Sequence, residues 1–343
     1  MRAFQLGPDG QASLREVAVP SARGKAVLLR VEAAGLCHSD IHLIETGFSR
    51  PDHRPFTLGH EIAGRVESCG DDVKGLAVGD RVAVYAPLGC GKCATCDSGS
   101  ANYCPMVVAG DSLALGIGAD GGMAEFVLVP DFRHLVPIGD MSAVAAAPLT
   151  DAGLTPFHAI SRSSRLKAGG AVTVVIGVGG LGHLAVQVLT ATSDANVIAV
   201  DLRQEALDLA VRGGASEAVP AGPGLEKELT RLLGRRRCDV VLDFVGAPET
   251  MALALAVLAP GGELSVVGSA GGSLVMAKSP GQTKGVQVTF PFWGTLPELN
   301  SVVSLAKSGS LHVETEVLPL DAVSEAVMRL KDGSVTGRIV LVP

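Results

Sequence analysis

Four cysteines in one short stretch have the residue type and spacing to bind a metal ion. The stretch CGKCATCDSGSANYC contains Cys90, Cys93, Cys96 and Cys104, four of the seven cysteines in the chain. Four thiolates spaced C-x2-C-x2-C-x7-C are typical of a closed tetrahedral Zn²⁺ site. Because four protein ligands leave no position for water or a substrate, the spacing predicts a structural zinc that orders a long loop. Four unrelated cysteines are one alternative, and an iron–sulfur cluster is another, but nothing else in the chain indicates electron transfer.

A second motif is a glycine-rich turn that could hold the phosphates of a dinucleotide. In VTVVIGVGGLGHLAVQVL, Gly177, Gly179 and Gly182 have the spacing G-x-G-x-x-G, with Gly180 and Leu181 inside the turn. The turn follows a predicted strand and begins a predicted helix, which is the context in which this motif binds a pyrophosphate. The first glycine permits the tight turn, the second lets phosphates approach the backbone, and the third lets the helix pack closely on the strand. A plain glycine turn is the alternative.

The next predicted strand ends in an acidic residue that favours one dinucleotide over another. In VIAVDLR, Asp201 lies where a carboxylate bonds the ribose hydroxyls of the adenosine. A carboxylate there repels a 2′-phosphate, so NAD is favoured over NADP. Arg203 weakens this prediction slightly, because an arginine two residues later could flank a phosphate. In the alternative, Asp201 only caps the next helix.

A third set of residues could bind a metal or transfer protons, but its members are far apart in the sequence. Each is weak evidence alone, because a single cysteine behaves as a small hydrophobic residue and a single buried histidine is usually a core residue. Their significance depends on whether the fold brings them together. The candidates are Cys37, His38, Ser39, Asp40 and His42 in GLCHSDIH, His60 and Glu61 in LGHEIAG, and Asp151 in PLTDAGLTP.

The elements that must position these residues change in type along the chain. The first 150 residues contain short runs such as AVLLRVEAAG and AEFVLVP, bounded by Gly and Pro, which predict an all-β barrel or sandwich. Residues 143–160 predict a helix. From residue 171, nearly continuous apolar strands alternate with helices, which predicts a parallel sheet covered on both faces. The C-terminal part predicts two helices and a final strand, GRIVLVP.

The composition limits the class of protein. The chain has 343 residues, 47% of them hydrophobic, and a net charge of −7, which fits two globular domains and disfavours a nucleic-acid partner. No apolar run approaches the roughly 18–20 residues that cross a bilayer, so no membrane partner is expected. The start MRAFQLGPDGQ lacks the order of a signal peptide, so we expect a cytoplasmic protein with reduced thiols.

Several motifs together resemble those of one enzyme family. GHEIAGRVESCGDDV, residues 59–73, resembles the zinc signature of the medium-chain zinc-dependent alcohol dehydrogenases, with Gly64, Gly70 and Val73 at the required positions. GLCHSD, the four-cysteine stretch and VIGVGGLGH also resemble that family and occur in the right order. PLTDAGLTPFHAI and PFWGT resemble the bacterial NAD-dependent secondary alcohol dehydrogenase branch. The resemblance covers essentially the whole chain.

The resemblance implies an α/β fold with two domains. Residues 1–151, completed by residues 295–343, would form a mainly-β GroES-like catalytic domain with the zinc sites. Residues 152–294 would form the NAD-binding domain, a Rossmann fold with a doubly wound parallel sheet. Relatives are dimers or tetramers, so a homodimer or homotetramer is expected.

The resemblance also implies that Cys37, His60 and Asp151 hold a catalytic zinc, so that each chain binds NAD and two Zn²⁺. Many relatives have Cys at the third position, but a carboxylate is also a zinc ligand. It would make the metal a harder Lewis acid that is easier to strip. Glu61 would lie close behind the metal. Asp40 would orient the imidazole of His60, with a simple turn residue as the alternative.

Four further residues have roles that the resemblance implies. Ser39 would take the proton of the alcohol, and His42 would receive it by way of the cofactor ribose, since a histidine titrates near neutral pH. An exposed helix histidine is the alternative for His42. His38 stands where many relatives have an Arg that faces the pyrophosphate, and a neutral side chain would hold the cofactor less tightly. Arg338 would be a second pyrophosphate contact, with a surface salt bridge as the alternative.

Aromatic residues are the candidates for the substrate pocket. Phe292 and Trp293 in FPFWGT lie where relatives have aromatic residues near the nicotinamide and substrate, and Phe48 and Phe56 could line the entrance. A core position is the alternative for Trp293. An apolar pocket would accept alcohols and ketones of moderate bulk.

The leading hypothesis is a zinc-dependent oxidoreductase that transfers a hydride between NAD and a small-molecule alcohol/ketone pair of the secondary type. A polyol, aldehyde or terpenoid-alcohol dehydrogenase on the same scaffold is an alternative, because analogy of fold does not separate these substrates. A zinc-free quinone reductase and a non-catalytic NAD-binding sensor are more distant. The complete set of metal-ligand residues argues against the first, and the presence of Ser39 and His42 argues against the second.

Overall fold

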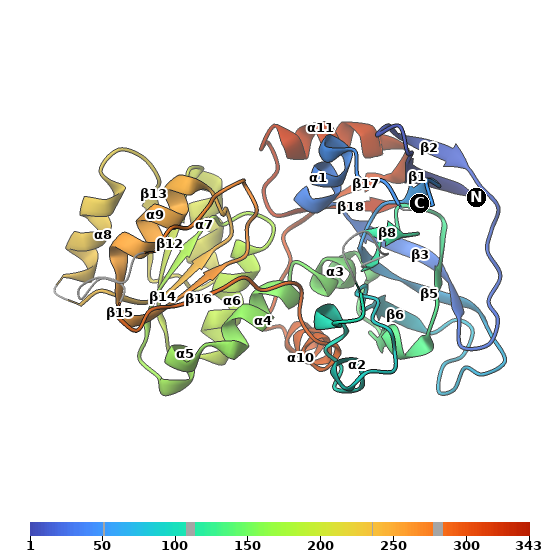
Figure 1. Cartoon of the computed structure of the whole chain (residues 1–343), viewed down its shortest axis with the longest axis horizontal. Helices are drawn as coiled ribbons and strands as arrows, with labels where there is room; N and C mark the ends of the chain where they lie inside the picture. The colour runs from blue at the N-terminus through green and yellow to red at the C-terminus, as the bar shows by residue number, and fades with distance from the viewer. Residues whose placement is uncertain (51, 108–113, 235, 277–283) are drawn as a thin grey trace. The chain divides into compact units, whose positions relative to one another are not determined.

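Two units, each with sheets of its own, make up the chain (Figure 1). The computed structural model describes residues 1–50, 52–107, 114–234, 236–276 and 284–343. Unit 1 contains Met1–Asp151, Thr295–Lys307 and Val313–Pro343, and unit 2 contains Ala152–Gly294 and Ser308–His312. Residues 308–312 therefore group with unit 2, although the sequence prediction assigned all of 295–343 to the first domain.

Unit 1 is mainly β. Its largest sheet has the strand order β10-β6-β5-β3-β18-β17, and β9 also pairs with β3. Two smaller sheets have the orders β2-β1-β4 and β7-β8. The strands are β1 (Arg2–Leu6), β2 (Ala12–Glu16), β3 (Val27–Gly35), β4 (Phe56–Thr57), β5 (Glu61–Cys69), β6 (Arg81–Val84), β7 (Ala114–Leu115), β8 (Gly118–Ala119), β9 (Phe126–Val129), β10 (Leu135–Pro137), β17 (Thr315–Pro319) and β18 (Arg338–Val342).

The register of the large sheet brings distant parts of the sequence to one place. Gly35, the last residue of β3, lies opposite Glu61, the first residue of β5. Gly35 also pairs with Val340 of β18, and β18 begins at Arg338. The chain leaving β3, the chain entering β5 and the start of β18 are therefore neighbours, although they lie far apart in the sequence.

Short helices connect the strands of unit 1. The predicted helix over residues 143–160 is wrong as one element, because the chain turns out of the helix at Asp151 (φ −133°). The break follows Pro148, which has no N–H to donate to a continuing helix. The helices are α1 (His38–Thr46), α2 (Ala94–Asp97), η1 (Ala101–Tyr103), η2 (Phe132–His134), α3 (Ala143–Ala146), η3 (Ala147–Thr150), α10 (Leu296–Lys307), η4 (Leu320–Ala322) and α11 (Val323–Lys331).

Unit 2 contains a parallel sheet of six strands in the order β13-β12-β11-β14-β15-β16. The prediction of a doubly wound parallel sheet is confirmed. The central strands are almost entirely buried, as expected when both faces of a parallel sheet are covered. The strands are β11 (Val172–Ile176), β12 (Asn196–Asp201), β13 (Glu217–Pro220), β14 (Cys238–Asp243), β15 (Leu258–Val266) and β16 (Gln287–Thr289).

Helices cover both faces of this sheet. In Figure 1, α8 and α9 lie on one side of the strands, and α4, α5 and α6 lie on the other. The apolar side chains of β11, β12 and β14 pack against Met251, Ala254 and Val257 of α9 to form one core. The helices are α4 (Leu154–Arg162), α5 (Ser164–Ala168), α6 (Gly182–Thr192), α7 (Gln204–Arg212), α8 (Leu225–Leu233) and α9 (Pro248–Val257).

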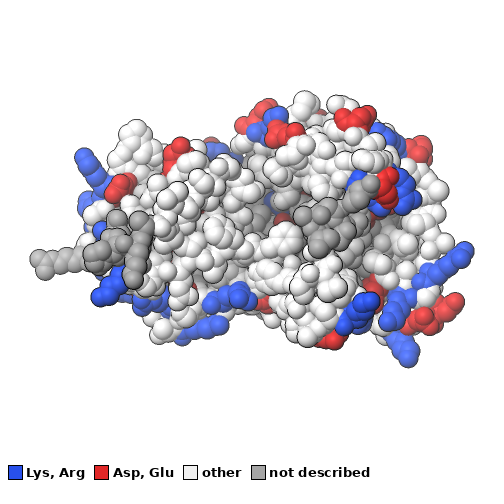
Figure 2. Space-filling model, in the orientation of Figure 1, with Lys and Arg blue, Asp and Glu red and all other residues white. Residues whose placement is uncertain are grey.

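Two features of the described residues concern possible partners. None of the helices among the described residues has the length and apolar character needed to cross a membrane. On the face drawn in Figure 2, the Lys and Arg side chains of the described residues are scattered among acidic and uncharged ones and form no broad basic area.

Candidate functional site

The fold of unit 1 brings three of the scattered candidates together. Cys37 follows β3 and begins α1, His60 directly precedes β5, and Asp151 follows η3. All three side chains are buried, and their possible ligand atoms lie within 4.8 Å of one another. The Oδ2 atom of Asp151 lies 3.7 Å from the sulfur of Cys37 and 3.5 Å from Nε2 of His60.

These separations fit a tetrahedral metal. Zn²⁺ bonds of about 2.0–2.3 Å place neighbouring ligand atoms about 3.3–3.8 Å apart. A thiolate, an imidazole and a carboxylate are all ligands that Zn²⁺ accepts. Three protein ligands leave one position open, which is the arrangement of catalytic zinc sites and not of structural ones.

Asp40 connects two of the three residues. Its Oδ2 accepts a hydrogen bond from the Cys37 backbone N–H at 2.9 Å, and its Oδ1 accepts one from Gly59 N–H at 3.2 Å. The same Oδ1 lies 3.5 Å from Nδ1 of His60. Asp40 is fully buried in the first turn of α1, so it is not a surface turn residue. Its position is the one expected of a carboxylate that orients a metal-bound imidazole.

The surroundings of His60 favour a positive charge. Burial alone would lower the pKa of His60, but the charge of Asp40 and hydrogen bonds to Asp151, Asp40 and Cys37 outweigh burial and raise the pKa well above its usual range. Acidic groups that attract a proton to this point also attract a metal cation. The donor set and its electrostatics therefore both fit Zn²⁺.

Glu61 and Arg338 form a buried ion pair beside the three ligands. Nε of Arg338 donates to Oε2 of Glu61 at 2.9 Å, and Nη2 of Arg338 bonds the other carboxylate oxygen. Nη2 also lies 3.7 Å from Oδ2 of Asp151. The side chains of Arg338 and Glu61 are 2% and 0% exposed. Gly35 makes room for this pair, because a Cβ at that position would overlap the Glu61 carboxylate.

The alternative interpretation of Arg338 as a surface ion pair is wrong, because the Arg338 side chain is buried. Burial would lower the pKa of Arg338, but the charges of Cys37 and Glu61 raise it well above its usual range, so the guanidinium stays charged. Sequence reasoning missed the partnership with Glu61. A single arginine at the start of the apolar run RIVLV was the available signal. The predicted contact of Arg338 with a pyrophosphate stays a prediction.

Three candidates lie on α1, next to the metal ligands. Ser39 Oγ is 3.7 Å from the sulfur of Cys37, and the Ser39 side chain is exposed. His38 and His42 are also exposed. His42 therefore fits both the predicted proton relay and an exposed helix histidine, and its role stays a prediction.

The aromatic candidates form two separate pairs, one in each unit. In unit 1, Phe48 packs edge-on against Phe56, with ring centroids 5.8 Å apart. Phe56 is 1% exposed, so the prediction that it lines an entrance is corrected: it supports Phe48, which is half-buried. In unit 2, Phe292 packs edge-on against Trp293, with centroids 5.1 Å apart.

Trp293 has an unusual backbone conformation. Its φ is +52°, a left-handed value that is rare for a bulky residue. Its side chain is 4% exposed. The burial fits the core position that was the alternative for Trp293, and its place in the substrate pocket stays a prediction.

The four cysteines of the short stretch also come together. Their sulfur atoms lie within 4.8 Å of one another, and those of Cys93 and Cys104 are 3.8 Å apart. Four Zn–S bonds of about 2.3 Å give a sulfur–sulfur distance of about 3.8 Å in a tetrahedron. Burial acts to raise the pKa of Cys104, but backbone N–H groups of Cys90 and Met106 and the neighbouring thiols lower it to about 6. A thiol that ionises near neutral pH is ready to bind a metal.

The three glycines of the motif in unit 2 have three different surroundings. Gly177 has φ +85°, which favours glycine, and its N–H bonds Val200 O at 2.8 Å. A Cβ at Gly182 would overlap the carbonyl of Gly177, so α6 packs closely on β11 only because the residue is glycine. Apart from its chain neighbours, no atom of the described residues lies within 4 Å of a Cβ placed at Gly179. That open space is what a phosphate approaching the backbone requires. Gly180 and Leu181 lead into α6.

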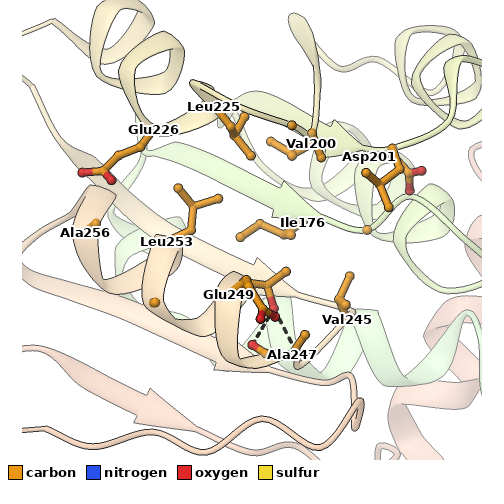
Figure 3. Close-up of a pocket in the computed structure, with 16 residues that line it drawn as sticks. Ile176, Val200, Asp201, Leu225, Glu226, Val245, Ala247, Glu249, Leu253 and Ala256 are labelled. Atoms are coloured by element: carbon orange, nitrogen blue, oxygen red, sulfur yellow. Dashed lines mark hydrogen bonds between the residues drawn. The ribbon is translucent and has the colours of Figure 1, made fainter.

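Beside this turn is a pocket of about 790 Å³ (Figure 3). Asp201 lies at one end of it and Glu226 at the other, with the apolar side chains between them. The lining residues are Ile176, Gly177, Val200, Asp201, Leu202, Ala221, Gly222, Leu225, Glu226, Val245, Ala247, Glu249, Thr250, Ala252, Leu253 and Ala256.

The charges of the pocket bear on the choice of dinucleotide. Among the described residues, the charged ones that line the pocket are Asp201, Glu226 and Glu249, all acidic. Asp201 accepts hydrogen bonds from Val178 N–H at 2.7 Å and Arg203 N–H at 3.0 Å. The Arg203 guanidinium lies near Asp201, with Nε 3.7 Å from Oδ1. An acidic lining disfavours a cofactor with an extra phosphate.

Comparison with known proteins agrees with this arrangement. Residues 23–140 match the family described as alcohol dehydrogenase GroES-like domain, and residues 180–308 match the family described as zinc-binding dehydrogenase. An NAD-dependent alcohol dehydrogenase of Sulfurisphaera tokodaii is 36% identical, with all of both chains covered.

Two solved structures are similar in fold over the whole chain. The alcohol dehydrogenase of the hyperthermophilic archaeon Aeropyrum pernix is 33% identical, with a TM-score of 0.92 and all of both chains covered. The acetophenone reductase of Geotrichum candidum, solved in complex with NAD, is 29% identical, with a TM-score of 0.86, and the match covers 100% of this chain and 97% of that one. The chain belongs to the zinc-dependent medium-chain alcohol dehydrogenase family, and the predicted family and fold class are confirmed.

Proposed function

We propose that this NAD-dependent alcohol dehydrogenase interconverts secondary alcohols and ketones, with Cys37, His60 and Asp151 as the ligands of its catalytic zinc. The observation that supports the proposal most is the buried set of three donor atoms, with Asp151 Oδ2 3.5–3.7 Å from the other two. The secondary-alcohol preference is supported by the resemblance of PLTDAGLTPFHAI and PFWGT to that branch. Similarity to an enzyme named for a ketone, acetophenone, supports it further.

The residues around the three ligands have distinct tasks in this proposal. Bound zinc supplies a Lewis acid that polarises the substrate oxygen. Asp40 holds the His60 ring through Nδ1 and fixes Cys37 through its backbone N–H. Glu61 and Arg338 set the charge behind the ligands. Ser39 Oγ lies 3.7 Å from the Cys37 sulfur, so it would accept the proton of a substrate oxygen held there while it gives up its own hydroxyl proton. The ribose of the cofactor would carry that proton to His42, which would release it to solvent.

Unit 2 binds NAD in this proposal. Gly177, Gly179 and Gly182 form the pyrophosphate turn, and Asp201 bonds the adenosine ribose. The space over Gly179 supports a pyrophosphate at the turn, and the acidic side chains that line the pocket support NAD over NADP. The nicotinamide supplies the redox chemistry, and the protein supplies its orientation.

Cys90, Cys93, Cys96 and Cys104 hold a structural zinc in the same proposal. The loop that contains them meets the start of α10, where Leu296 N–H donates to Gly99 O at 2.9 Å. Removing the metal would therefore release both the loop and this contact within unit 1.

Unit 2 has an exposed strand edge that bears on the oligomeric state of the protein. Among the described strands, β16 lies at the edge of its sheet, and Phe290, directly after it, is 64% exposed. An exposed apolar residue at an unpaired strand edge favours pairing with a second copy, so we propose a homo-oligomer. Phe290→Asp should lower the mass measured by light scattering. A reducing cytoplasm fits the seven free thiols, four of which must stay reduced to hold zinc.

A kinetic survey tests the proposed activity. Initial rates would be measured with NAD and NADP on linear, branched and aryl secondary alcohols, on primary alcohols and on polyols. We expect the highest kcat/KM for secondary alcohols with NAD. Higher kcat/KM for polyols or primary alcohols would replace the substrate proposal, and no NADH formation on any of them would favour a binding protein. Wild type should contain two zinc ions per chain and Cys37→Ala one.

A further inference from the structure

A buried carboxylate at the end of β14 has no role in the chemistry described so far. Asp243 is the last residue of that strand, and its side chain is 0% exposed. Its Oδ1 accepts hydrogen bonds from the backbone N–H groups of Val245 and Gly246, both at 2.9 Å. Its Oδ2 accepts one from the Thr250 hydroxyl at 2.8 Å. One side chain thus holds both ends of the segment between β14 and the first turn of α9.

That segment is a wall of the dinucleotide pocket. Val245, Ala247 and Thr250 all line the pocket. Ala247 N–H donates to Thr250 Oγ1 at 3.0 Å, one of the hydrogen bonds drawn in Figure 3. A Cβ at Gly177 would lie 2.7 Å from Val245 Cγ2, so the position of Val245 limits the space over the first glycine of the phosphate turn.

The backbone of Asp243 holds a second segment against the same wall. Its carbonyl accepts hydrogen bonds from Val267 N–H at 2.8 Å and Gly268 N–H at 3.1 Å. Gly272 N–H bonds Gly246 O at 2.9 Å. A Cβ at Gly246 or Gly268 would overlap the other segment's backbone. The two backbones therefore meet without side chains between them, so residues 245–250 pack directly against the second segment.

We propose that Asp243 is a positioning residue for NAD. It acts through the segment 245–250, because the backbone N–H groups of Val245 and Gly246 would lose their acceptor without the carboxylate and the segment would leave this conformation. When a binding-competent conformation is only partly populated, the apparent dissociation constant rises by the reciprocal of that fraction. The inference rests on the proposed binding of NAD in this pocket.

The opposite end of the same strand offers a matched control. Asp239 Oδ2 accepts hydrogen bonds from Val172 N–H at 2.9 Å and from Arg236 Nη2 at 2.8 Å. Asp239 is thus also a strand aspartate that ties β14 to its surroundings. It is not part of the pocket lining, because it lies at the end of β14 away from the phosphate turn.

The experiment is a titration of zinc-loaded enzyme with NADH, followed by nicotinamide fluorescence, for wild type, Asp243→Ala, Asp243→Asn and Asp239→Ala. We expect Asp243→Ala to raise the Kd about tenfold or more. Asp243→Asn keeps an oxygen for the two N–H groups and should stay within about threefold of wild type. Asp239→Ala should lower the Tm without changing the Kd.

Turnover adds a second readout. In Asp243→Ala, KM for NAD should rise while kcat at saturating NAD and zinc content stay near wild type. An unchanged Kd in Asp243→Ala, or an equal rise in Asp239→Ala, overturns the inference. A Kd in Asp243→Asn as high as in Asp243→Ala also overturns it, because charge and not hydrogen bonding would then be responsible.

Failure of Asp243→Ala to fold and failure of wild type to bind NADH are distinct outcomes. If Asp243→Ala does not fold, Thr250→Val removes one of the three hydrogen bonds to Asp243, together with the bond from Ala247 N–H, and should raise the Kd about threefold; an unchanged Kd in a folded Thr250→Val refutes the inference. If wild type itself does not bind NADH, the proposed cofactor site fails, which is distinct from a wild type that binds and an Asp243→Ala that binds equally well.

Discussion

The buried pair of Glu61 and Arg338 should stabilise unit 1 strongly. Replacing Arg338 with Met leaves the Glu61 carboxylate, which is 0% exposed, without its cation. It also removes the positive group 3.7 Å from Asp151. Breaking a buried ion pair by removing one partner costs about 3–5 kcal/mol, because the remaining charge has neither partner nor water.

The expected effect is large enough to measure directly. For a domain of this size, about 3–5 kcal/mol corresponds to a fall in Tm of about 6–20 °C. The assay is urea and thermal unfolding of zinc-loaded protein. Arg231→Met is the matched control, since Arg231 pairs with Glu228 on the exposed surface of α8 and should leave the Tm unchanged.

A second variant separates loss of charge balance from loss of packing. In Glu61→Gln/Arg338→Met, no charge is left unpaired at the pair, so the double variant should be more stable than Arg338→Met alone. A double variant as unstable as the sum of its parts would mean that packing, not charge, explains the loss. Arg338→Met with the stability of wild type would refute the burial argument itself.

Three further predictions concern the metals, the cofactor and pH. Cys37→Ala should abolish turnover and keep one zinc and the fold, whereas Cys93→Ala should lower zinc content, Tm and expression; unchanged melting and zinc content in Cys93→Ala would refute a structural site. Asp201→Gly should raise kcat/KM for NADP relative to NAD by about tenfold or more, and an unaltered ratio would count against its ribose role. Burial raises the pKa of Tyr85 far above its usual value of about 10. The contribution of Tyr85 to the free energy of unfolding is therefore complete below pH ~10. It falls as the pH rises further, because the tyrosine of the unfolded chain ionises before the buried one. Tyr85→Phe should flatten the decline in urea-unfolding free energy above pH ~10, and an equally steep decline would contradict this.

Motifs whose residues lie close together in the sequence can be predicted from the sequence most directly. The four cysteines converge because their spacing lets one loop supply all four ligands. The glycine turn works similarly, since the strand before it and the helix after it fix where Gly177 and Gly182 lie. In both cases local backbone geometry is sufficient, so the sequence predicts the site without the rest of the fold.

Local patterns failed where tertiary contacts override propensity. Residues 143–160 have the composition of one helix, yet the chain leaves the helix at Asp151, where that side chain meets Cys37 and His60. Phe56 looked like a pocket residue but is part of the core. Neither outcome follows from residues close in sequence.

By itself, the sequence determined the family, the two kinds of domain, the four-cysteine site and the dinucleotide turn. Only the tertiary structure decided which scattered residues meet. Arg338 reaches Glu61 because β18 pairs with β3 at Gly35, and Gly35 lies opposite Glu61 in β5. Asp243 reaches Thr250 because the chain turns tightly between β14 and α9. Contacts of this kind depend on strand register and on close approach of backbone segments. The number of residues that separate the two partners in the sequence predicts neither of these.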